Sequence, residues 1–159
     1  MKRAALISPC GLYRYRLTRH WDPDKAPLTF VMLNPSTADA EVDDRTIRRC
    51  MGFAERERAG GIVVVNLYAY RATKPSALRS AADPRGPEND SHLMDAIRAA
   101  TGRPIVCAWG TNGDGASFIR KAQAKGAELV ALGITKRGHP RHPLYVPSDE
   151  PLIPYPARQ

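Results

Sequence analysis

Polar side chains stand at the C-terminal ends of four short apolar runs along this 159-residue chain. The runs cover residues 28–33, 62–65, 105–108 and 129–132, and they lead to Asn34, to Asn66, to Trp109-Gly110 and to a loop with His139 and His142. A carboxamide can hold a water molecule or hydroxyl in one orientation, and an imidazole can stabilise an anion that develops on a leaving group. The set therefore predicts a site that orients small polar groups and tolerates negative charge.

Asn34 is followed by Pro35, which disfavours the helical region for the residue before it. We expect the Asn34 carboxamide to project from the end of its strand. An amide is not a strong general base, so Asp39 or Asp43 is the candidate for that role. On its own, Asn-Pro is also typical of a simple turn.

Asn66 closes an unbroken apolar run and must find hydrogen-bond partners, because a buried and unpaired polar group costs about 1–3 kcal/mol. The donor and acceptor of a carboxamide match the edge of a nucleobase. A structural bond to the backbone of a loop is the alternative.

Trp109-Gly110 opens a glycine-rich turn that can hold a phosphate at the start of the next helix. The turn lacks the Lys-Ser/Thr of a Walker A motif and does not match GxGxxG, so no nucleotide cofactor is predicted. The last loop holds His139, Arg141, His142 and Tyr145, a group that core packing does not explain. Two histidines without a third ligand make a poor metal site.

These side chains require elements that bring the four strand ends together. Helices are expected near residues 44–59, 88–100 and 114–125, between the four apolar strands, with Asp43 or Asp44 as the first cap. Residues 4–8 and 12–20 predict an antiparallel hairpin at the sheet edge, residues 67–87 a long loop, and residues 146–159 an extended proline-rich tail. The alternation predicts one domain over residues 1–159: an α/β, three-layer α/β/α sandwich with a mainly parallel four-stranded central sheet plus the edge hairpin. In such sheets ligands bind beyond the C-terminal ends of the strands.

The chain carries 24 Lys and Arg against 16 Asp and Glu, a net charge of +8. This excess favours an anionic partner, and nucleic acid first; a solubilising surface is the alternative. Cys10, Cys50 and Cys107 form neither a CxxC pair nor a ligand spacing, so no metal, cluster or disulfide is predicted, and Cys107 is expected in the core. The sequence shows neither a signal peptide nor a membrane span, which predicts a cytoplasmic protein.

The four clusters together resemble the motifs of the uracil-DNA glycosylase superfamily, in the same order and over residues 28–146. Asn34-Pro35-Ser36 resembles the first motif, although Ser36 stands where those enzymes carry Tyr or Gly and Met32 where they usually carry Gly. Val65-Asn66 is similar to the strand end that reads the flipped base, Trp109-Gly110 to the third motif, and His142-Pro143-Leu144 to the last. The whole chain also resembles a small bacterial and phage family of unknown function.

The resemblance implies a DNA N-glycosylase that extrudes a damaged or modified base and works as a monomer without a cofactor. Asn34, with Asp39, would place the attacking water, and His142 or His139 would stabilise the departing base. The residues implied to bind the base are Asn66, Ser36, Pro35, Trp109 and Gly110. Leu144 and Tyr145 would meet the nucleic-acid strand, and the basic residues expected along its backbone are Arg71, Lys74, Lys136, Arg137 and Arg141. The alternatives are a non-catalytic module that binds a modified base, and an enzyme of free nucleosides or nucleotides.

Overall fold

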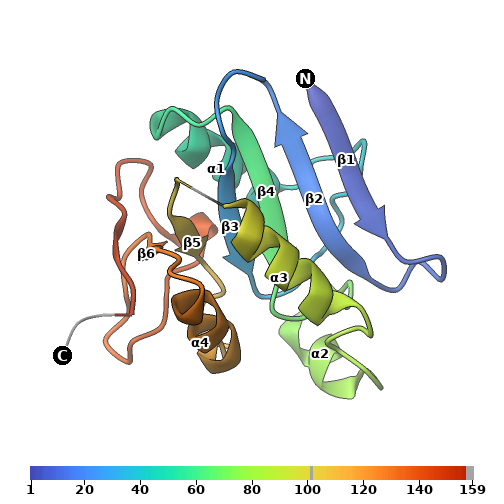
Figure 1. The fold of residues 1–159 in the computed structure, drawn as a ribbon. Helices are drawn as coiled ribbons and strands as arrows, with labels where there is room; N and C mark the ends of the chain where they lie inside the picture. Colours follow the sequence, from blue (N-terminus) through green and yellow to red (C-terminus); the bar gives the residue numbers. More distant parts are fainter. Residues whose placement is uncertain (101, 157–159) are drawn as a thin grey trace.

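A computed structural model describes residues 1–100 and 102–156 of the chain. Its centre is a mixed sheet of seven strands in the order β1-β2-β4-β3-β5-β6-β7 (Figure 1). Neighbours within β4, β3, β5 and β6 are parallel, whereas β1 with β2, β2 with β4 and β6 with β7 are antiparallel. The strands are β1 (Lys2–Ile7), β2 (Arg14–His20), β3 (Leu28–Met32), β4 (Gly61–Asn66), β5 (Ile105–Cys107), β6 (Leu129–Ala131) and β7 (Ile153–Pro154).

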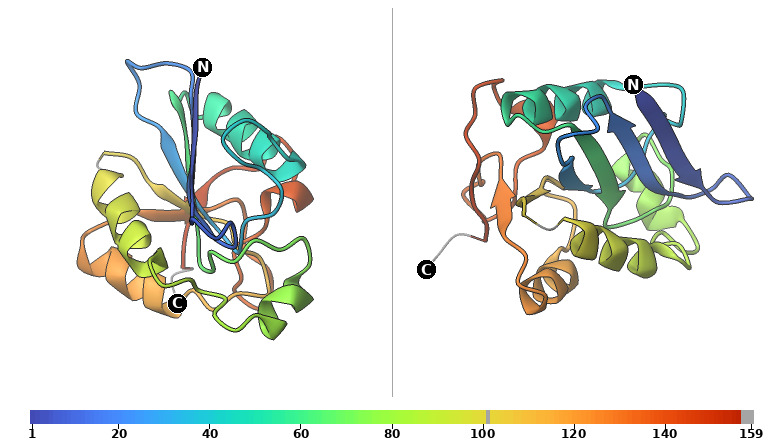
Figure 2. Two further views of the ribbon diagram at one scale, coloured as in Figure 1. Left: turned by 90° about the vertical axis from the view of Figure 1, so that its right-hand side faces the viewer. Right: turned by 45° about the horizontal axis from the view of Figure 1, so that its top comes forward.

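Four α-helices and one short 3-10 helix connect the described strands. They are α1 (Arg45–Arg56), α2 (Pro75–Ser80), α3 (Asn89–Ala99), α4 (Ala116–Ala124) and the 3-10 helix Pro143–Tyr145. In two views of Figure 2, α1 lies on one face of the sheet, and α3 and α4 lie on the other. The mixed α/β class predicted from the sequence is confirmed, with the hairpin strand β1 at one edge.

Alternation along the buried strands divides the core between the two faces. Phe30 and Val64 belong to the cluster that packs on Ile47 and Phe53 of α1. Val31 and Val65, one residue further along each strand, belong to the cluster with α3 and α4. Even-numbered residues of β3 and β4 therefore face α1 and odd-numbered residues face α3 and α4, and this parity assigns a side chain at the strand end to a face.

The structure departs from the sequence prediction in two places. Residues 67–87 were expected to be mainly loop, but they contain α2, which begins at Pro75 because proline is compatible with the first helical position. The sheet has seven strands where a four-stranded centre with a hairpin was predicted. The added strand is β7 in the proline-rich tail, and two residues are too few for any periodic signal; residues 157–159 of that tail lie outside the described part of the chain.

Cys50 and Cys107 are both buried, and burial raises the pKa of both thiols. Cys107 lies in the core as predicted. Within the described residues, no helix has the length and apolar character needed to cross a membrane.

Candidate functional site

A cavity of about 480 Å³ lies where the ends of β3, β4, β5 and β6 meet. Its walls come from the strand ends, from the starts of α1 and α2, and from the loop that holds the 3-10 helix. The lining includes Arg14, Asn34, Pro35, Ser36, Asp44, Asn66, Trp109, Gly110, Arg141, His142, Leu144 and Tyr145. All four sequence clusters therefore contribute to one cavity of ordinary ligand-binding size.

Asn66 is the most unusual polar residue of this cavity. Its side chain is 0% exposed, and neither Oδ1 nor Nδ2 has a hydrogen-bond partner within the described residues. Parity places it on the α1 face of β4, with Ile62 and Val64. A buried carboxamide with both functions unpartnered by the protein offers one donor and one acceptor to a ligand.

Asn34 is held in one orientation by the loop that follows β4. Its Nδ2 donates to the carbonyl oxygens of Ala72 at 2.8 Å and of Pro35 at 3.0 Å. Ala72 in turn donates its backbone N–H to Pro35 O at 2.9 Å. Two carbonyl acceptors fix the nitrogen of the amide on that side, so Oδ1 is the atom that can accept a hydrogen bond from another molecule.

His142, and not His139, lines the cavity. The backbone N–H of Leu144 donates to His142 Nδ1 at 3.1 Å, which assigns the proton of the neutral ring to Nε2. Burial lowers the pKa of His142, and this effect exceeds the opposing effect of Asp44. The imidazole is therefore neutral at pH 7 and can donate a hydrogen bond through Nε2. His139 lies outside the lining, where its backbone bonds to Thr135.

Arg14 is a cavity residue that the sequence reasoning missed. It is 2% exposed, and its Nη1 donates to Ala38 O at 3.0 Å while its Nε has no described partner. Leu17 and Arg19 of the same strand face α1, so regular alternation would turn Arg14 to the opposite face. A β-bulge reverses the alternation: Ile7 pairs with Arg14 and Leu6 with Arg16, which leaves Tyr15 as the extra residue of β2. The bulge thus brings Arg14 to the cavity, while Tyr15 stacks on His92 of α3.

Asp44 supplies the carboxylate of the cavity. Its Oδ1 accepts from the backbone N–H of Ile47 at 2.9 Å, and its Oδ2 accepts from that of Ala38 at 3.3 Å. Asp44 is therefore the cap of α1, one of the two alternatives left open by the sequence. Its position in the cavity gave no separate signal, because a cap residue is expected at that point of any helix.

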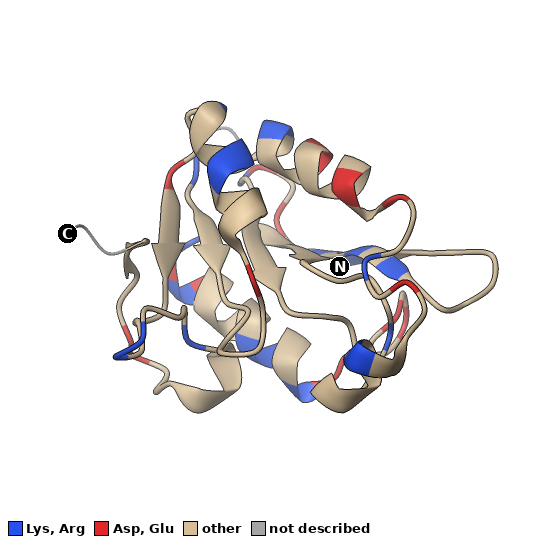
Figure 3. Ribbon diagram, turned by 90° about the horizontal axis from the view of Figure 1, so that it is seen from below, with Lys and Arg blue, Asp and Glu red and all other residues tan. Residues whose placement is uncertain are grey.

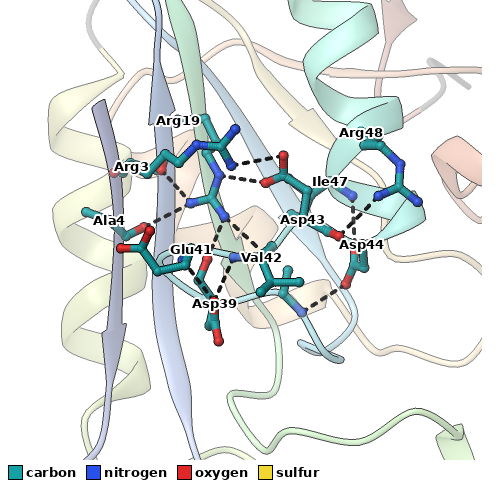
Figure 4. Close-up of polar contacts among 12 residues, drawn as sticks. Arg3, Ala4, Arg19, Asp39, Glu41, Val42, Asp43, Asp44, Ile47 and Arg48 are labelled. Atoms are coloured by element: carbon teal, nitrogen blue, oxygen red, sulfur yellow. Dashed lines mark hydrogen bonds and ion pairs between the residues drawn. The ribbon is translucent and has the colours of Figure 1, made fainter. Parts of the chain in front are cut away.

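Asp39 and Asp43, the two candidates for a general base, are not among the residues that line the cavity. Their polar contacts are drawn in Figure 4. Asp39 accepts from the backbone N–H groups of Val42 and Glu41, both at 2.8 Å, and these bonds lower the pKa of its carboxyl. Asp43 forms ion pairs with buried Arg19 at 2.7 Å and with Arg3 at 3.1 Å. These contacts hold the loop between β3 and α1.

The remaining candidates for base binding line the cavity in different ways. Pro35 is buried and Ser36 is half-buried. Trp109 is only 2% exposed, and its ring packs edge-on against Phe118 and Tyr155 in the cluster with α4. Gly110 has φ +74°, and an added Cβ would lie 3.8 Å from the His142 Cβ, so the glycine fits a left-handed turn beside the histidine.

The predicted backbone contacts divide into two groups. Arg141, Leu144 and Tyr145 line the cavity, and Tyr145 is 80% exposed with its ring 5.4 Å from that of His142. The predicted backbone contacts that lie outside the lining are Arg71, Lys74, Lys136 and Arg137. Basic residues lie on several elements with acidic residues interspersed among them, as Figure 3 shows. Charge alone therefore does not define one nucleic-acid surface.

A second, open groove adjoins the cavity at Leu144, which lines both. Three arginines of α1 line this groove, Arg45, Arg48 and Arg49. Arg49 donates to the carbonyl oxygens of Pro143 and Val146, which ties the loop after His142 to α1. Arg45 and Arg48 are exposed. The sequence reasoning missed this groove because these arginines form the ordinary polar face of an amphipathic helix.

Among residues 1–100 and 102–156, no cluster of three or more His, Cys, Asp or Glu side chains has the arrangement of a metal site. A comparison with curated proteins finds no match. The sequence of residues 14–144, which contains every cavity residue named above except Tyr145, matches one protein family. The chain belongs to that family, which is described as Protein of unknown function (DUF1643).

Proposed function

We propose that the protein binds a base extruded from DNA and hydrolyses its N-glycosidic bond. The observation that carries the proposal is the pair of unpartnered amide atoms of fully buried Asn66, in a cavity shared with Asn34 and His142. Such an amide costs folding free energy unless a ligand with a complementary donor and acceptor binds it. The Watson–Crick edge of a base has this pattern, and flipped bases are read through that edge.

The same proposal extends to the fold. The parallel strand order β4-β3-β5-β6, with helices on both faces, supports a three-layer arrangement like that of the uracil-DNA glycosylase superfamily. In that arrangement the first, second and last motifs would meet as Asn34, Asn66 and His142. Base extrusion costs a few kcal/mol, which basic side chains and stacking by Tyr145 would offset.

In the proposed reaction, Asn34 Oδ1 accepts a hydrogen bond from water and directs its oxygen to C1′ of the sugar. The C1′–N bond breaks as the sugar develops positive charge, the bonding electron pair stays on the base, and the water oxygen forms the new bond to C1′. His142 Nε2–H stabilises the resulting base anion by a hydrogen bond. The proton released by the water goes to the departing base or to solvent, so the step is a simple hydrolysis.

The test uses purified protein with single- and double-stranded oligonucleotides that carry uracil, hypoxanthine or hydroxymethyluracil. Alkali then cleaves any abasic site, and the strand fragments are separated. We expect scission with at least one substrate for the wild type, and loss of scission for Asn66→Ala and His142→Ala. Asp39→Asn is the matched control, because Asp39 lies outside the cavity lining. No scission with any base in either strand form counts against the proposal.

One observation favours a binding module over an enzyme. Both oxygens of Asp44, the carboxylate of the cavity, accept backbone N–H groups that hold the start of α1. A general base takes up a proton, and protonation of Asp44 would weaken the two bonds that cap α1. A module of this kind would prefer modified over plain DNA without forming product, and this preference would survive Asn34→Ala.

A further inference from the structure

Arg14 is a buried arginine without an ion-pair partner among the described residues. It is 2% exposed, yet it takes part in no ion pair within 4.0 Å among the described residues. Burial lowers its pKa to about 10, so the guanidinium is still protonated at neutral pH. An isolated buried charge is costly, and proteins normally pair it.

Arg19 shows how this fold satisfies a buried arginine when the role is structural. It lies five residues further along β2 and is 0% exposed. Its Nε bonds to Asp43 at 2.7 Å, and its other nitrogens donate to carbonyl oxygens, including those of Thr18 and Asp39 (Figure 4). Arg14 has only the Ala38 carbonyl and an unpartnered Nε. The contrast indicates that Arg14 has a free place for a partner that residues 1–100 and 102–156 do not supply.

None of the charged groups around Arg14 in the described residues forms an ion pair with it. Asp44 lines the same cavity, but both its oxygens accept backbone N–H groups, from Ile47 and Ala38. The negative charge of Asp44 raises the pKa of Arg14, although the two groups form no ion pair within 4.0 Å, whereas the positive charges of Arg71 and Arg19 lower it. One cavity is therefore lined both by an arginine that can bind an anion and by Asn66, whose amide can bind a base edge.

We propose that Arg14 binds a phosphate group of the nucleotide whose base contacts Asn66. The planar fork of a guanidinium matches two phosphate oxygens, and such charge-assisted bonds are stronger than neutral ones. This inference rests on the proposed function in taking the base to lie against Asn66, and it adds that the ligand is a nucleotide and not a free base. The phosphate comes either from a DNA strand or from a mononucleotide.

The first experiment titrates inorganic phosphate into the wild type, Arg14→Gln and Arg16→Gln by calorimetry, with thermal unfolding in parallel. Arg16 is the matched control: it is on β2, its Nε is likewise unpartnered, and it lies outside the cavity lining. We expect Arg14→Gln to weaken phosphate binding by about 10- to 100-fold, and Arg16→Gln to leave it within about twofold. Equal loss in both variants, or none in Arg14→Gln, overturns the proposal.

A second readout does not depend on whether Arg14→Gln folds. A crystal of the wild type soaked in phosphate should show the ion at the Arg14 guanidinium. A phosphate bound only elsewhere overturns the proposal. Thermal unfolding also distinguishes a ligand-binding arginine from a structural one. Without phosphate, Arg14→Gln should have a melting temperature no lower than that of the wild type, because the change removes a buried unpaired charge.

The two phosphate sources are separated with ligands that carry the same base. If a mononucleotide binds more tightly than its nucleoside and Arg14→Gln removes that gain, the source is a single nucleotide. If only an oligonucleotide shows the dependence on Arg14, the source is the strand. If neither ligand shows it, the proposal fails. Failure of the proposed function is separate: it appears as no base release while phosphate binding still depends on Arg14.

Discussion

Asn89, the first residue of α3, donates its Nδ2 to the carbonyl oxygen of Asn66 at 2.8 Å and also to that of Leu67 at 3.1 Å. The carbonyls at the end of β4 are thus held by a buried amide from the helix on the opposite face to α1. Asn89 does not touch the cavity, but it positions the backbone that carries the Asn66 side chain.

Asn89→Ala should therefore lower the free energy of unfolding by about 1–3 kcal/mol, because two buried carbonyl groups lose their donor. Urea unfolding measures this change. Ser91→Ala, an exposed position on the same helix, is the control and should change little. A wild-type urea midpoint for Asn89→Ala would show that the two bonds do not hold the strand end.

Asn66→Leu should behave in the opposite way. Leucine has a similar volume, and the change removes a buried amide that has no described partner, so the free energy of unfolding should stay level or rise by up to about 2 kcal/mol. Discrimination between bases should meanwhile fall by about 1–3 kcal/mol. If urea unfolding shows Asn66→Leu as destabilised as Asn89→Ala, the amide serves the fold and not a ligand.

Asn34→Asp should reduce both activity and stability, although aspartate is the stronger base. The change places a carboxylate oxygen where Nδ2 now donates to Ala72 O and Pro35 O, so two attractions become repulsions. We expect a loss of about 1–3 kcal/mol in the free energy of unfolding at pH 7, and recovery as the pH falls below the carboxyl pKa. Asn34→Ala, which has no such charge, should show no recovery at low pH.

His142 should make stability depend on pH below its ordinary pKa of about 6.5. Burial lowers the pKa of His142 in the folded state, so the unfolded chain binds a proton first. The free energy of unfolding is therefore highest above pH 6.5, and it decreases as the pH falls from 6.5 towards the folded-state pKa. Thermal unfolding of the wild type and of His142→Gln between pH 5 and 8 measures it. If the melting temperature of His142→Gln depends on pH as strongly as that of the wild type, another group causes the effect.

The arginine groove predicts where a nucleic-acid strand leaves the cavity. If phosphates follow Arg45 and Arg48, the double alanine variant should flatten the slope of log affinity against log salt by about two, one unit for each contact. The double alanine variant of Lys136 and Arg137, which lie outside both lining sets, is the control. Fluorescence anisotropy with a labelled oligonucleotide measures both slopes. A larger effect from Lys136 and Arg137 would reverse the assignment.

The sequence predicted the strand ends well because four apolar runs and their polar successors are a local signal. Asn34, Asn66 and His142 lie together because parallel strands share one edge of the sheet, and this follows from topology alone. The sequence could not predict which aspartate faces the cavity. Asp39 and Asp44 lie near one another in the chain, and only the path of the loop determines which of them lines the cavity. Arg14 escaped prediction for a different reason: a bulge leaves no mark in the pattern of residue types.

The bulge in β2 absorbs one residue without changing which side chain faces the cavity. Ile7 pairs with Arg14 and Leu6 with Arg16, so Tyr15 is the residue that the ladder between β1 and β2 does not need. In a chain without Tyr15, regular alternation would keep Arg14 opposite Ile7 and on the face of α1, and only the stacking of Tyr15 on His92 would be lost. The extra residue and the bulge are thus compensating changes, and a deletion at this place would alter the contact with α3 while the charge of the cavity is retained.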